Sequence, residues 1–357
     1  MNEPESSALE VRPGVSAPPS VNLQLRRIPP PDVSPVELDA RLRAGDRAAL
    51  AQAITLIESE QPTHHDAARE LIDLALSQAR ASRRIGFTGV PGVGKSTLIN
   101  QIGLHWIAQG HRVAVLAVDP SSVASRGSIL GDKGRMPGLA VSPQAFVRPS
   151  PGGQSLGGVA HKTREAALLC EAAGYDIIAI ETIGVGQSEV AVHAMVDCFL
   201  LLMLPGAGDE LQGLKRGIME MADVVAVTKS DHENVARAQL ACSQIQNALH
   251  YLAPTPSGWS PTAQCVSSEA PGTVGNLANS ISEFLSHEER TGWFARRRAH
   301  QALEWMEELV VEQVVRTALL DPRILALRDT LAPQVSSGIL SARRAADEIL
   351  QALRHEH

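Results

Sequence analysis

The stretch of residues 83–100, RRIGFTGVPGVGKSTLIN, constrains the fold of this chain more than any other. Residues 85–88 form a short apolar run typical of a buried parallel strand, and Thr97-Leu98-Ile99 opens an apolar helix. Between them the chain matches the pattern G-x-x-x-x-G-K-[ST], in the strand, loop and helix context in which that pattern binds phosphate. A glycine-rich turn before a helix is the alternative, which the Lys-Ser pair and the preceding strand disfavour. We therefore expect a nucleotide-binding protein.

The residue types of this loop each suit phosphate binding. Glycines let the backbone adopt angles that a side chain forbids, so that successive N–H groups can line an anion site at the start of a helix. Lys95 would reach the β- and γ-phosphates, and the Ser96 hydroxyl would bind Mg²⁺. The predicted nucleotide-binding residues of the loop are Gly89, Val90, Pro91, Gly92, Val93, Gly94, Lys95, Ser96 and Thr97.

Further apolar runs alternate with helical patterns, which indicates a parallel sheet with helical crossovers. The expected strands after the first cover residues 113–118, 177–180, 199–204, 224–227 and 264–266. Polar residues follow each run, at the carboxyl ends of strands where open α/β sheets bind ligands. The predicted fold is an α/β P-loop NTPase with a mainly parallel central sheet, a helical N-terminal extension and a helical C-terminal arm.

Composition divides the chain into four parts. Residues 1–35 are rich in Pro and Ser and lack periodic apolar spacing, so we expect a disordered arm there. Residues 36–82 are helical, residues 83–286 hold the nucleotide-binding core, and residues 287–357 are helical and charged. The last part is too short for a core of its own, so we expect it to pack on the core or on a second subunit.

Two short runs have both a functional and an ordinary interpretation. His64-His65 could bind a metal, but no cluster of further ligands accompanies them, and we interpret them as part of a surface loop. Arg296-Arg297-Arg298 could bind anions, but a solvated helix face is the more usual role of such a run.

Charge, aromatic content and cysteine usage argue against several classes of protein. A net charge of −7, an isoelectric point near 6.0 and 3% aromatic residues argue against nucleic-acid binding. The cysteines are scattered without a C-x-x-C pair, as expected for buried thiols in a reducing compartment: Cys170, Cys198, Cys242 and Cys265. The longest apolar runs are far shorter than the ~18 residues of a membrane span, and the N-terminal residues lack a signal-peptide pattern. We expect a cytoplasmic protein without a membrane partner.

A second motif indicates which base is bound. The Asp231 carboxylate can accept hydrogen bonds from N1–H and from the exocyclic amine of guanine, whereas adenine offers no such pair of donors. Thr228-Lys229-Ser230-Asp231 resembles the [NT]-K-x-D guanine signature, with the stem of Lys229 over the base and Thr in place of the commoner Asn. GTP is therefore the expected nucleotide. The loop whose backbone N–H would meet the guanine carbonyl contains Ser267, Ser268 and Glu269.

Acidic residues after the strands are the candidate magnesium ligands. Asp119 and Glu181 follow neighbouring strands and would hold Mg²⁺ together with Ser96, directly or through water, because this ion prefers hard oxygen ligands. The alternative is that both are solvated strand ends. Gly184 stands where the glycine of a D-x-x-G motif would direct its N–H to the γ-phosphate, and Asp132 lies in a glycine-rich loop able to change shape with that phosphate. The predicted catalytic residues are Lys95, Asp119, Asp132, Glu181 and Gly184.

Several segments resemble one family of GTPases in their order and spacing. They read GVPGVGKST, AVDPSS, GSILGDKGRM, RPSPGGQSLGGVAHKTREAALLCEAAGYD, ETIGVGQSEVAV, LPGAGDELQGLKRGIMEMAD and TKSD. By these segments, the chain is identified as a member of the MeaB/ArgK GTPases, and the resemblance runs from about Leu38 to its C-terminus. These are G-protein chaperones of methylmalonyl-CoA mutase and of related adenosylcobalamin-dependent acyl-CoA mutases.

The resemblance implies a homodimer with a helical C-terminal dimerisation arm. It also implies that the GTP or GDP state controls cobalamin loading on the mutase and removal of inactivated cofactor, so that cobalamin is met only through the partner. Residues 205–217 would form an additional switch, with Asp209, Glu210 and Lys215 as its responding residues; a polar loop before a helix is the alternative. The chain departs from the family pattern at residues 123–126, at Gly134 and at residues 271–273.

We therefore expect a Mg²⁺-dependent GTPase that hydrolyses GTP to GDP and phosphate by positioning and charge neutralisation, and that serves an acyl-CoA mutase. A metallochaperone-type GTPase for another metalloenzyme, such as a nickel-inserting one, would need a Cys/His cluster that the sequence lacks. An ATP-dependent protein kinase of transport components is disfavoured by Asp231. A non-hydrolysing scaffold is disfavoured by Ser96 and the acidic strand ends.

Overall fold

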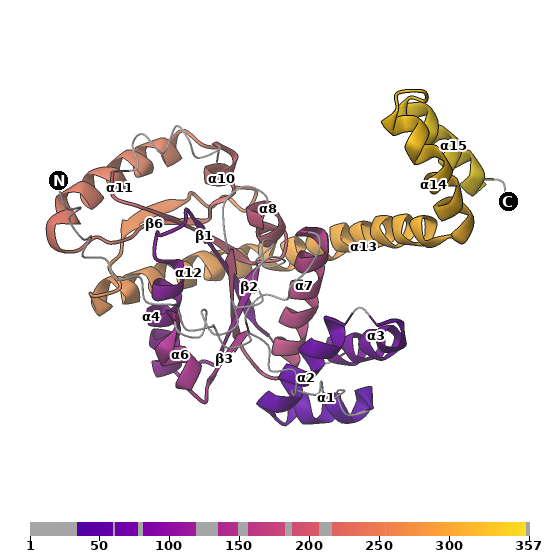
Figure 1. Ribbon diagram of the computed structural model, residues 1–357. Coiled ribbons are helices and arrows are strands. Elements are labelled where there is room, and N and C mark those ends of the chain that lie inside the picture. Colours follow the sequence, from indigo (N-terminus) through magenta and orange to yellow (C-terminus); the bar gives the residue numbers. More distant parts are fainter. Residues whose placement is uncertain are drawn as a thin grey trace, which may run out of the picture.

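The computed structural model describes residues 34–59, 61–77, 81–118, 135–148, 156–182, 188–206, 216–253 and 255–354 (Figure 1). Its described part contains one sheet of seven strands in the order β3-β2-β4-β1-β5-β6-β7. The strands are β1 (Arg83–Gly89), β2 (Val113–Val118), β3 (Ala145–Arg148), β4 (Ile177–Thr182), β5 (Cys198–Met203), β6 (Val224–Val227) and β7 (Thr262–Cys265). The registered strand pairs are all parallel, so the carboxyl ends of these strands share one edge of the sheet. The predicted α/β fold with a mainly parallel sheet is confirmed.

Helices cover both faces of the sheet, because side chains alternate between its faces along each strand. In β4, Ile178 and Ile180 belong to one hydrophobic core, whereas Ile177 and Ala179 belong to the other. The first core is closed by α7 (Leu156–Ala172), α8 (Ser188–His193), α10 (Arg216–Met221) and α11 (Val235–His250). The second is closed by α4 (Lys95–Ala108), α6 (Pro137–Val141) and α12 (Pro271–Thr291). The result is a three-layer domain with β1 near the middle of its sheet.

Three N-terminal helices extend the first core outward: α1 (Pro35–Arg43), α2 (Arg47–Ile57) and α3 (Pro62–Leu76). The carboxylate of Asp46 caps α2 by accepting hydrogen bonds from the backbone N–H groups of Ala48 and Ala49. The interpretation of His64-His65 as a surface loop is wrong, because α3 already begins at Pro62 and includes both histidines. Proline at the first position of a helix costs no hydrogen bond, and its fixed backbone angle favours a helix start at Pro62.

Sequence analysis missed one of the seven strands, β3. Strand β3 is four residues long and pairs only with β2 in the described sheet, so it carries little of the apolar pattern that reveals a central strand. Helix α14 (Pro322–Ser336) contains Pro333, and its periodicity is correspondingly weak. The last helix is α15 (Ala342–Arg354).

The C-terminal helices form an arm, here defined as α13 (Trp293–Leu320), α14 and α15. In Figure 1 the far half of α13 leaves the three-layer domain, and α14 and α15 lie against each other well away from the sheet. Large apolar side chains along α13 are exposed, among them Leu303, Met306, Val310, Val314 and Leu320. Of the two expected positions for residues 287–357, α14 and α15 do not take the one on the core of their own chain, and packing on a second subunit stays a prediction. The helices of the described part include none that is long and apolar enough to cross a membrane.

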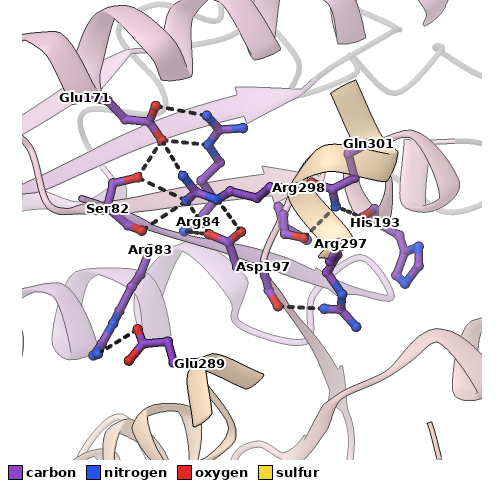
Figure 2. A network of polar contacts seen from close by, with 11 residues as sticks. Ser82, Arg83, Arg84, Glu171, His193, Asp197, Glu289, Arg297, Arg298 and Gln301 are labelled. Atoms are coloured by element: carbon purple, nitrogen blue, oxygen red, sulfur yellow. Dashed lines mark hydrogen bonds and ion pairs between the residues drawn. The ribbon is translucent and has the colours of Figure 1, made fainter. Parts of the chain in front are cut away.

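The first turns of α13, here called the arm root (residues 293–305), are fastened to the amino-terminal edge of the sheet by buried ion pairs (Figure 2). Arg298 binds both carboxylate oxygens of Asp197, through Nε at 2.7 Å and Nη2 at 2.6 Å. Arg297 binds both oxygens of Asp223, each at 3.1 Å. These carboxylates also accept from backbone N–H groups, Asp197 from Arg84 and Asp223 from Phe199. The root is thus tied to the starts of β1, β5 and β6.

This arrangement corrects the interpretation of the arginine run as a solvated helix face. Of the three, only Arg296 is exposed, whereas Arg297 and Arg298 lie against carboxylates that are 2% and 1% exposed, respectively. Burial alone lowers the pKa of each of these two guanidiniums, but the paired carboxylates raise it more, so both pKa values lie above the ordinary one. The partners are remote in sequence, and only the fold brings them together.

Candidate nucleotide-binding site

The glycine-rich loop joins the carboxyl end of β1 to the amino terminus of α4, next to the middle of the sheet. Gly94 caps α4 in the left-handed region, with φ of 97°. Gly89 has φ of 146°, and a Cβ there would lie 2.4 Å from the carbonyl oxygen of Leu202 on β5. Both positions therefore require glycine, as the sequence indicated. Pro91, Gly92 and Thr97 are exposed, and Val93 is buried beneath the loop.

Lys95 lies inside this loop. Its Nζ donates to the carbonyl oxygens of Gly89 at 2.5 Å and of Val90 at 3.3 Å, and the residue is only 8% exposed. Burial lowers the pKa of Lys95, and the carboxylates of Glu181 and Glu189 partly oppose that shift. The ammonium is thus held by weak neutral partners in a site where phosphate oxygens would be much stronger ones.

The side chains of Ser96 and Glu181 meet beside the loop. Ser96 Oγ, on the first turn of α4, donates a 2.8 Å hydrogen bond to Glu181 Oε1 at the end of β4. Glu181 is 6% exposed, at the end of a strand whose residues are all buried. A hydroxyl and a carboxylate oxygen this close form a pair of hard donors of the kind that Mg²⁺ accepts. The two residues therefore fit the predicted magnesium site.

The base-recognition loop follows β6 and is joined to the phosphate loop. The Thr228 hydroxyl lies 2.7 Å from the carbonyl oxygen of Val93 and 3.2 Å from that of Met203. A hydroxyl has one hydrogen to donate, and the shorter contact, to Val93, is the better one. Thr in place of Asn at this position thus still links the two loops. Lys229, next in sequence, adopts φ of 52°, a conformation that non-glycine residues rarely take.

Asp231 is oriented by the loop after β7. Ser267 Oγ donates to Asp231 Oδ2 at 2.5 Å and accepts from the backbone N–H of Glu269 at 3.1 Å. The Glu269 side chain is exposed and pairs with His232 at 2.9 Å. Ser268 lies between these anchored neighbours and is half-buried. The predicted base-binding residues therefore come together at the same sheet edge as the phosphate loop.

Several predicted site residues lie outside the described residues. They are Asp119, Asp132 and Gly184 of the predicted catalytic set, and Asp209, Glu210 and Lys215 of the predicted switch. The strands before them, β2, β4 and β5, all end at the edge that carries the phosphate loop.

Sequence analysis missed one residue that acts on this site. Glu189 on α8 is 1% exposed, and its charge acts on Lys95. No local pattern marks this role of Glu189, because Lys95 is remote in sequence and only the fold places the two charges close enough to interact.

Comparisons with known proteins decide the family. The model of the family described as methylmalonyl Co-A mutase-associated GTPase MeaB matches residues 50–322. The chain belongs to the MeaB family. A putative GTPase of Caulobacter vibrioides is 48% identical over 319 residues, which cover 88% of this chain and 96% of the relative. GTPase ArgK of Escherichia coli is 42% identical over 275 residues, covering 77% of this chain and 83% of that protein.

Two further similarities extend this result. The mouse protein named methylmalonic aciduria type A homolog, mitochondrial, is 43% identical over 323 residues, covering 88% of this chain and 78% of the relative. A crystal structure described as LAO/AO transport system kinase superposes with a TM-score of 0.70 at 32% identity, covering 90% of this chain and 98% of the other. As a MeaB-family protein with relatives named as GTPases, the chain is a GTP hydrolase.

Proposed function

We propose that this GTPase is a chaperone of an adenosylcobalamin-dependent methylmalonyl-CoA mutase, for which it supports cofactor loading and reactivation. The description of its family names a methylmalonyl-CoA mutase-associated GTPase. The mouse relative, similar over most of this chain, is named after methylmalonic aciduria. Both names support a link to the mutase as the client. In this proposal the client reads the nucleotide state of the GTPase, and the GTPase meets cobalamin only through that client.

The phosphate end of the site supports a Mg²⁺-dependent hydrolysis. Lys95 and the backbone N–H groups of its loop would hold the β- and γ-phosphates, and the ammonium would exchange two carbonyl contacts for charged ones. Ser96 and Glu181 would hold Mg²⁺, with Asp119 as a further candidate ligand. The ion would supply charge neutralisation at the transferred phosphate, while the chain supplies its position.

The base end carries the choice of GTP, and the contact between Asp231 and Ser267 is the observation that supports it best. Ser267 fixes one carboxylate oxygen of Asp231 at 2.5 Å, which orients the group as the acceptor pair that guanine N1–H and N2–H₂ require. Thr228 ties this loop to Val93 of the phosphate loop, so base and phosphates would be read by one connected unit. Adenine offers no matching donor pair.

The exposed apolar residues of α13 support a homodimer. Leu303, Met306, Val310 and Val314 are each more than half exposed, which is costly in water for a row of large apolar side chains. A second copy of the chain would cover them, with the arm as the dimerisation element. We place this complex in the cytoplasm, where the client enzyme would be met.

The test is phosphate release from GTP and from ATP, each with and without purified methylmalonyl-CoA mutase carrying its cofactor. We expect slow release from GTP that increases on adding the mutase, and negligible release from ATP. GTP hydrolysis indifferent to the mutase would contradict the client. Preferential hydrolysis of ATP would contradict the role of Asp231 and favour a kinase, the activity named for the similar crystal structure.

A further inference from the structure

The four cysteines of the chain differ in their access to solvent. Cys170 and Cys198 are 0% exposed, as the sequence led us to expect of all four. Cys242 on α11 and Cys265, the last residue of β7, are only half-buried. A sealed thiol behaves as a small apolar side chain, whereas thiol chemistry requires access from solvent. The second pair is therefore the one to which a reactive function can be assigned.

The packing of α11 on β7 places Cys242 and Cys265 opposite each other. Because β6 and β7 are parallel, the helix that connects them runs in the opposite direction to both. The Gln246 side chain accepts a 2.8 Å hydrogen bond from the backbone N–H of Ala263, which fixes the register of helix against strand. From Gln246 back to Cys242 is about 6 Å of helix, and from Ala263 on to Cys265 is about 6.6 Å of strand. Both steps stay on one face, and both cysteines pack against the same hydrophobic core.

The two thiols are in contact, and the contact makes them unequal. Burial raises the pKa of both, and the pKa of Cys242 reaches about 11. The S–H group of Cys242 donates a hydrogen bond to Sγ of Cys265, which opposes the effect of burial on the pKa of Cys265 and raises the pKa of Cys242 further. Cys265 therefore ionises first and supplies the attacking thiolate of the pair, with Cys242 beside it.

This pair lies next to the base-recognition loop. Cys265 stands two residues before Ser267, whose Oγ donates to Asp231 at 2.5 Å. Helix α11, which carries Cys242, begins four residues after Asp231. A covalent bond between the two sulfurs would therefore join the two segments that flank the contact between Ser267 and Asp231.

We propose that Cys242 and Cys265 are a site of reversible oxidation, at which a hydroperoxide converts the two thiols into a disulfide between α11 and β7. In a reducing compartment such a bond is transient and reports oxidation. The disulfide draws the end of β7 toward α11, disturbs the contact between Ser267 and Asp231, and so weakens GTP binding. This last consequence rests on the proposed role of Asp231 in binding the base.

The reaction balances with hydrogen peroxide as the oxidant. The Cys265 thiolate attacks one peroxide oxygen, the O–O bond breaks, and the released hydroxide takes up a proton to form water, which leaves Cys265 as a sulfenic acid. The sulfur of Cys242 then attacks the sulfur of Cys265. The S–O bond breaks, and the hydroxide leaves with the Cys242 proton as a second water. The two thiols lose one electron each, and one peroxide takes up both.

The first experiment maps the bond in the whole wild-type protein. The reduced, desalted protein is treated with hydrogen peroxide at pH 8, and the remaining thiols are then alkylated in denaturant. Chymotrypsin cleaves after Tyr251 and Trp259, between the two cysteines, so a disulfide appears as two linked peptides in the mass spectrum. We expect this link, its loss on adding dithiothreitol, and full alkylation of the two sealed cysteines. Four alkylated thiols after treatment, or a different pairing, would overturn the proposal.

Two variants separate the roles of the thiols. Cys242→Ser removes the second thiol, so the sulfenic acid at Cys265 should persist and react with dimedone. Cys265→Ser removes the attacking thiolate, and we expect at least tenfold less dimedone adduct at Cys242. Equal adducts in the two variants would contradict the order of the steps. The mapping in the wild type stands without either variant, should one of them fail to fold.

A matched control moves the thiol by one residue. Ser243→Cys in the Cys242→Ser protein places a thiol on an exposed position of the same helix, without the contact to Cys265. We expect no bond between residues 243 and 265 within one chain, although the new thiol is the more accessible one. Equal cross-linking in this protein and the wild type would mean that exposure and not contact decides, and the proposal would fail.

The second experiment measures GTP affinity before and after oxidation, by titration with a fluorescent GTP analogue. We expect the oxidised wild type to bind about three- to tenfold more weakly, with recovery in dithiothreitol, and the treated Cys265→Ser protein to be unchanged. A mapped disulfide with unchanged affinity would overturn the link to the nucleotide site. Asp231→Asn in the reduced protein tests the role of Asp231 separately, so the two failures can be told apart.

Discussion

The two edges of the sheet hold their polar side chains in different ways. At the carboxyl edge, Lys95 rests on backbone carbonyls, and Ser96 and Asp231 each make a contact with one neighbouring side chain. At the amino edge, Arg297 and Arg298 each bind a buried carboxylate through two hydrogen bonds. A ligand can replace the weak contacts at the carboxyl edge, whereas the bidentate ion pairs at the amino edge hold their partners to each other.

Desolvation explains this difference. Charges taken out of water must find excellent partners, and removal of one member leaves the other as an uncompensated buried charge. The amino edge meets that requirement within the protein, through Asp197, Asp223 and Glu171. The carboxyl edge meets it only in part within the described residues, as the proposed site for phosphate and Mg²⁺ would require. Buried polar groups thus occur both in a candidate ligand site and in a purely structural contact. Incomplete pairing indicates the first, and complete pairing indicates the second.

The largest predicted effect lies at the amino edge of the sheet, where Arg297 and Arg298 anchor the arm root. Arg298→Met leaves Asp197 buried without its bidentate partner, and we expect the free energy of unfolding to fall by about 3–5 kcal/mol. Urea denaturation of the purified protein measures it. Arg296→Met is the control, because Arg296 lies two residues earlier on the same helix and is exposed. We expect it to change the free energy of unfolding by less than about 0.5 kcal/mol. Equal, small effects of both substitutions would remove the distinction between the two edges.

The next effect concerns the carboxyl edge, and we expect it in the rate of GTP hydrolysis and not in the free energy of unfolding. Lys95→Ala removes the charge aimed at the phosphates, so GTP hydrolysis should fall by about 10²–10³-fold. Stability should change by less than about 1 kcal/mol, because the side chain donates only to carbonyls and its burial opposes its charge. Phosphate release and urea denaturation of one preparation give both values. A large loss of stability would show that this edge, too, is an anchor.

Asp231→Asn should alter nucleotide choice at the same edge. One acceptor becomes an amide donor, so we expect GTP affinity to fall about 10- to 100-fold. Xanthosine triphosphate, which carries a carbonyl where guanine has its amine, should bind better than GTP. Glu233→Gln, exposed two residues further on, provides the matched control. Titration with fluorescent nucleotides measures the affinities, and unchanged selectivity would mean that Asp231 does not contact the base.

The smallest effect is a dependence of stability on pH. The pKa of the buried Glu171 carboxyl lies below its ordinary value of 4.5, because Arg84 and Arg298 outweigh the effect of burial. Its contribution to stability is therefore complete above pH 4.5 and is lost as the pH falls through the lower, folded-state pKa. Urea denaturation between pH 7 and pH 3 should show a decline below 4.5 that is shallower in Glu171→Gln. An equal slope in both proteins would mean that Glu171 does not contribute to it.

Local patterns were enough to propose the candidate residues of the carboxyl edge. The glycines, Lys95 and Ser96 are contiguous, and Asp231 and Ser267 follow apolar runs, so a short window of sequence holds each part of the site. The anchor was not predictable in this way. Arg298 finds Asp197 and Glu171 more than a hundred residues earlier, and a run of three arginines carries no sign of such remote partners. Glu189 was missed for the same reason, because only the fold places α8 near Lys95.

Because α13 is long and is held at its root, a small rotation of the root moves its far end by a larger distance. From Arg298 to Leu320 the helix spans about 33 Å at 1.5 Å per residue, and its far half stands clear of the domain (Figure 1). A helix held firmly at one end acts as a lever, and a rotation of about 5° at its base moves the tip by about 3 Å. Its base is bonded to the starts of β1, β5 and β6, three of the strands whose other ends lead into the predicted nucleotide site and switch. Small shifts of those strands would therefore reach α14 and α15 enlarged, as a change of position large enough for another protein to recognise.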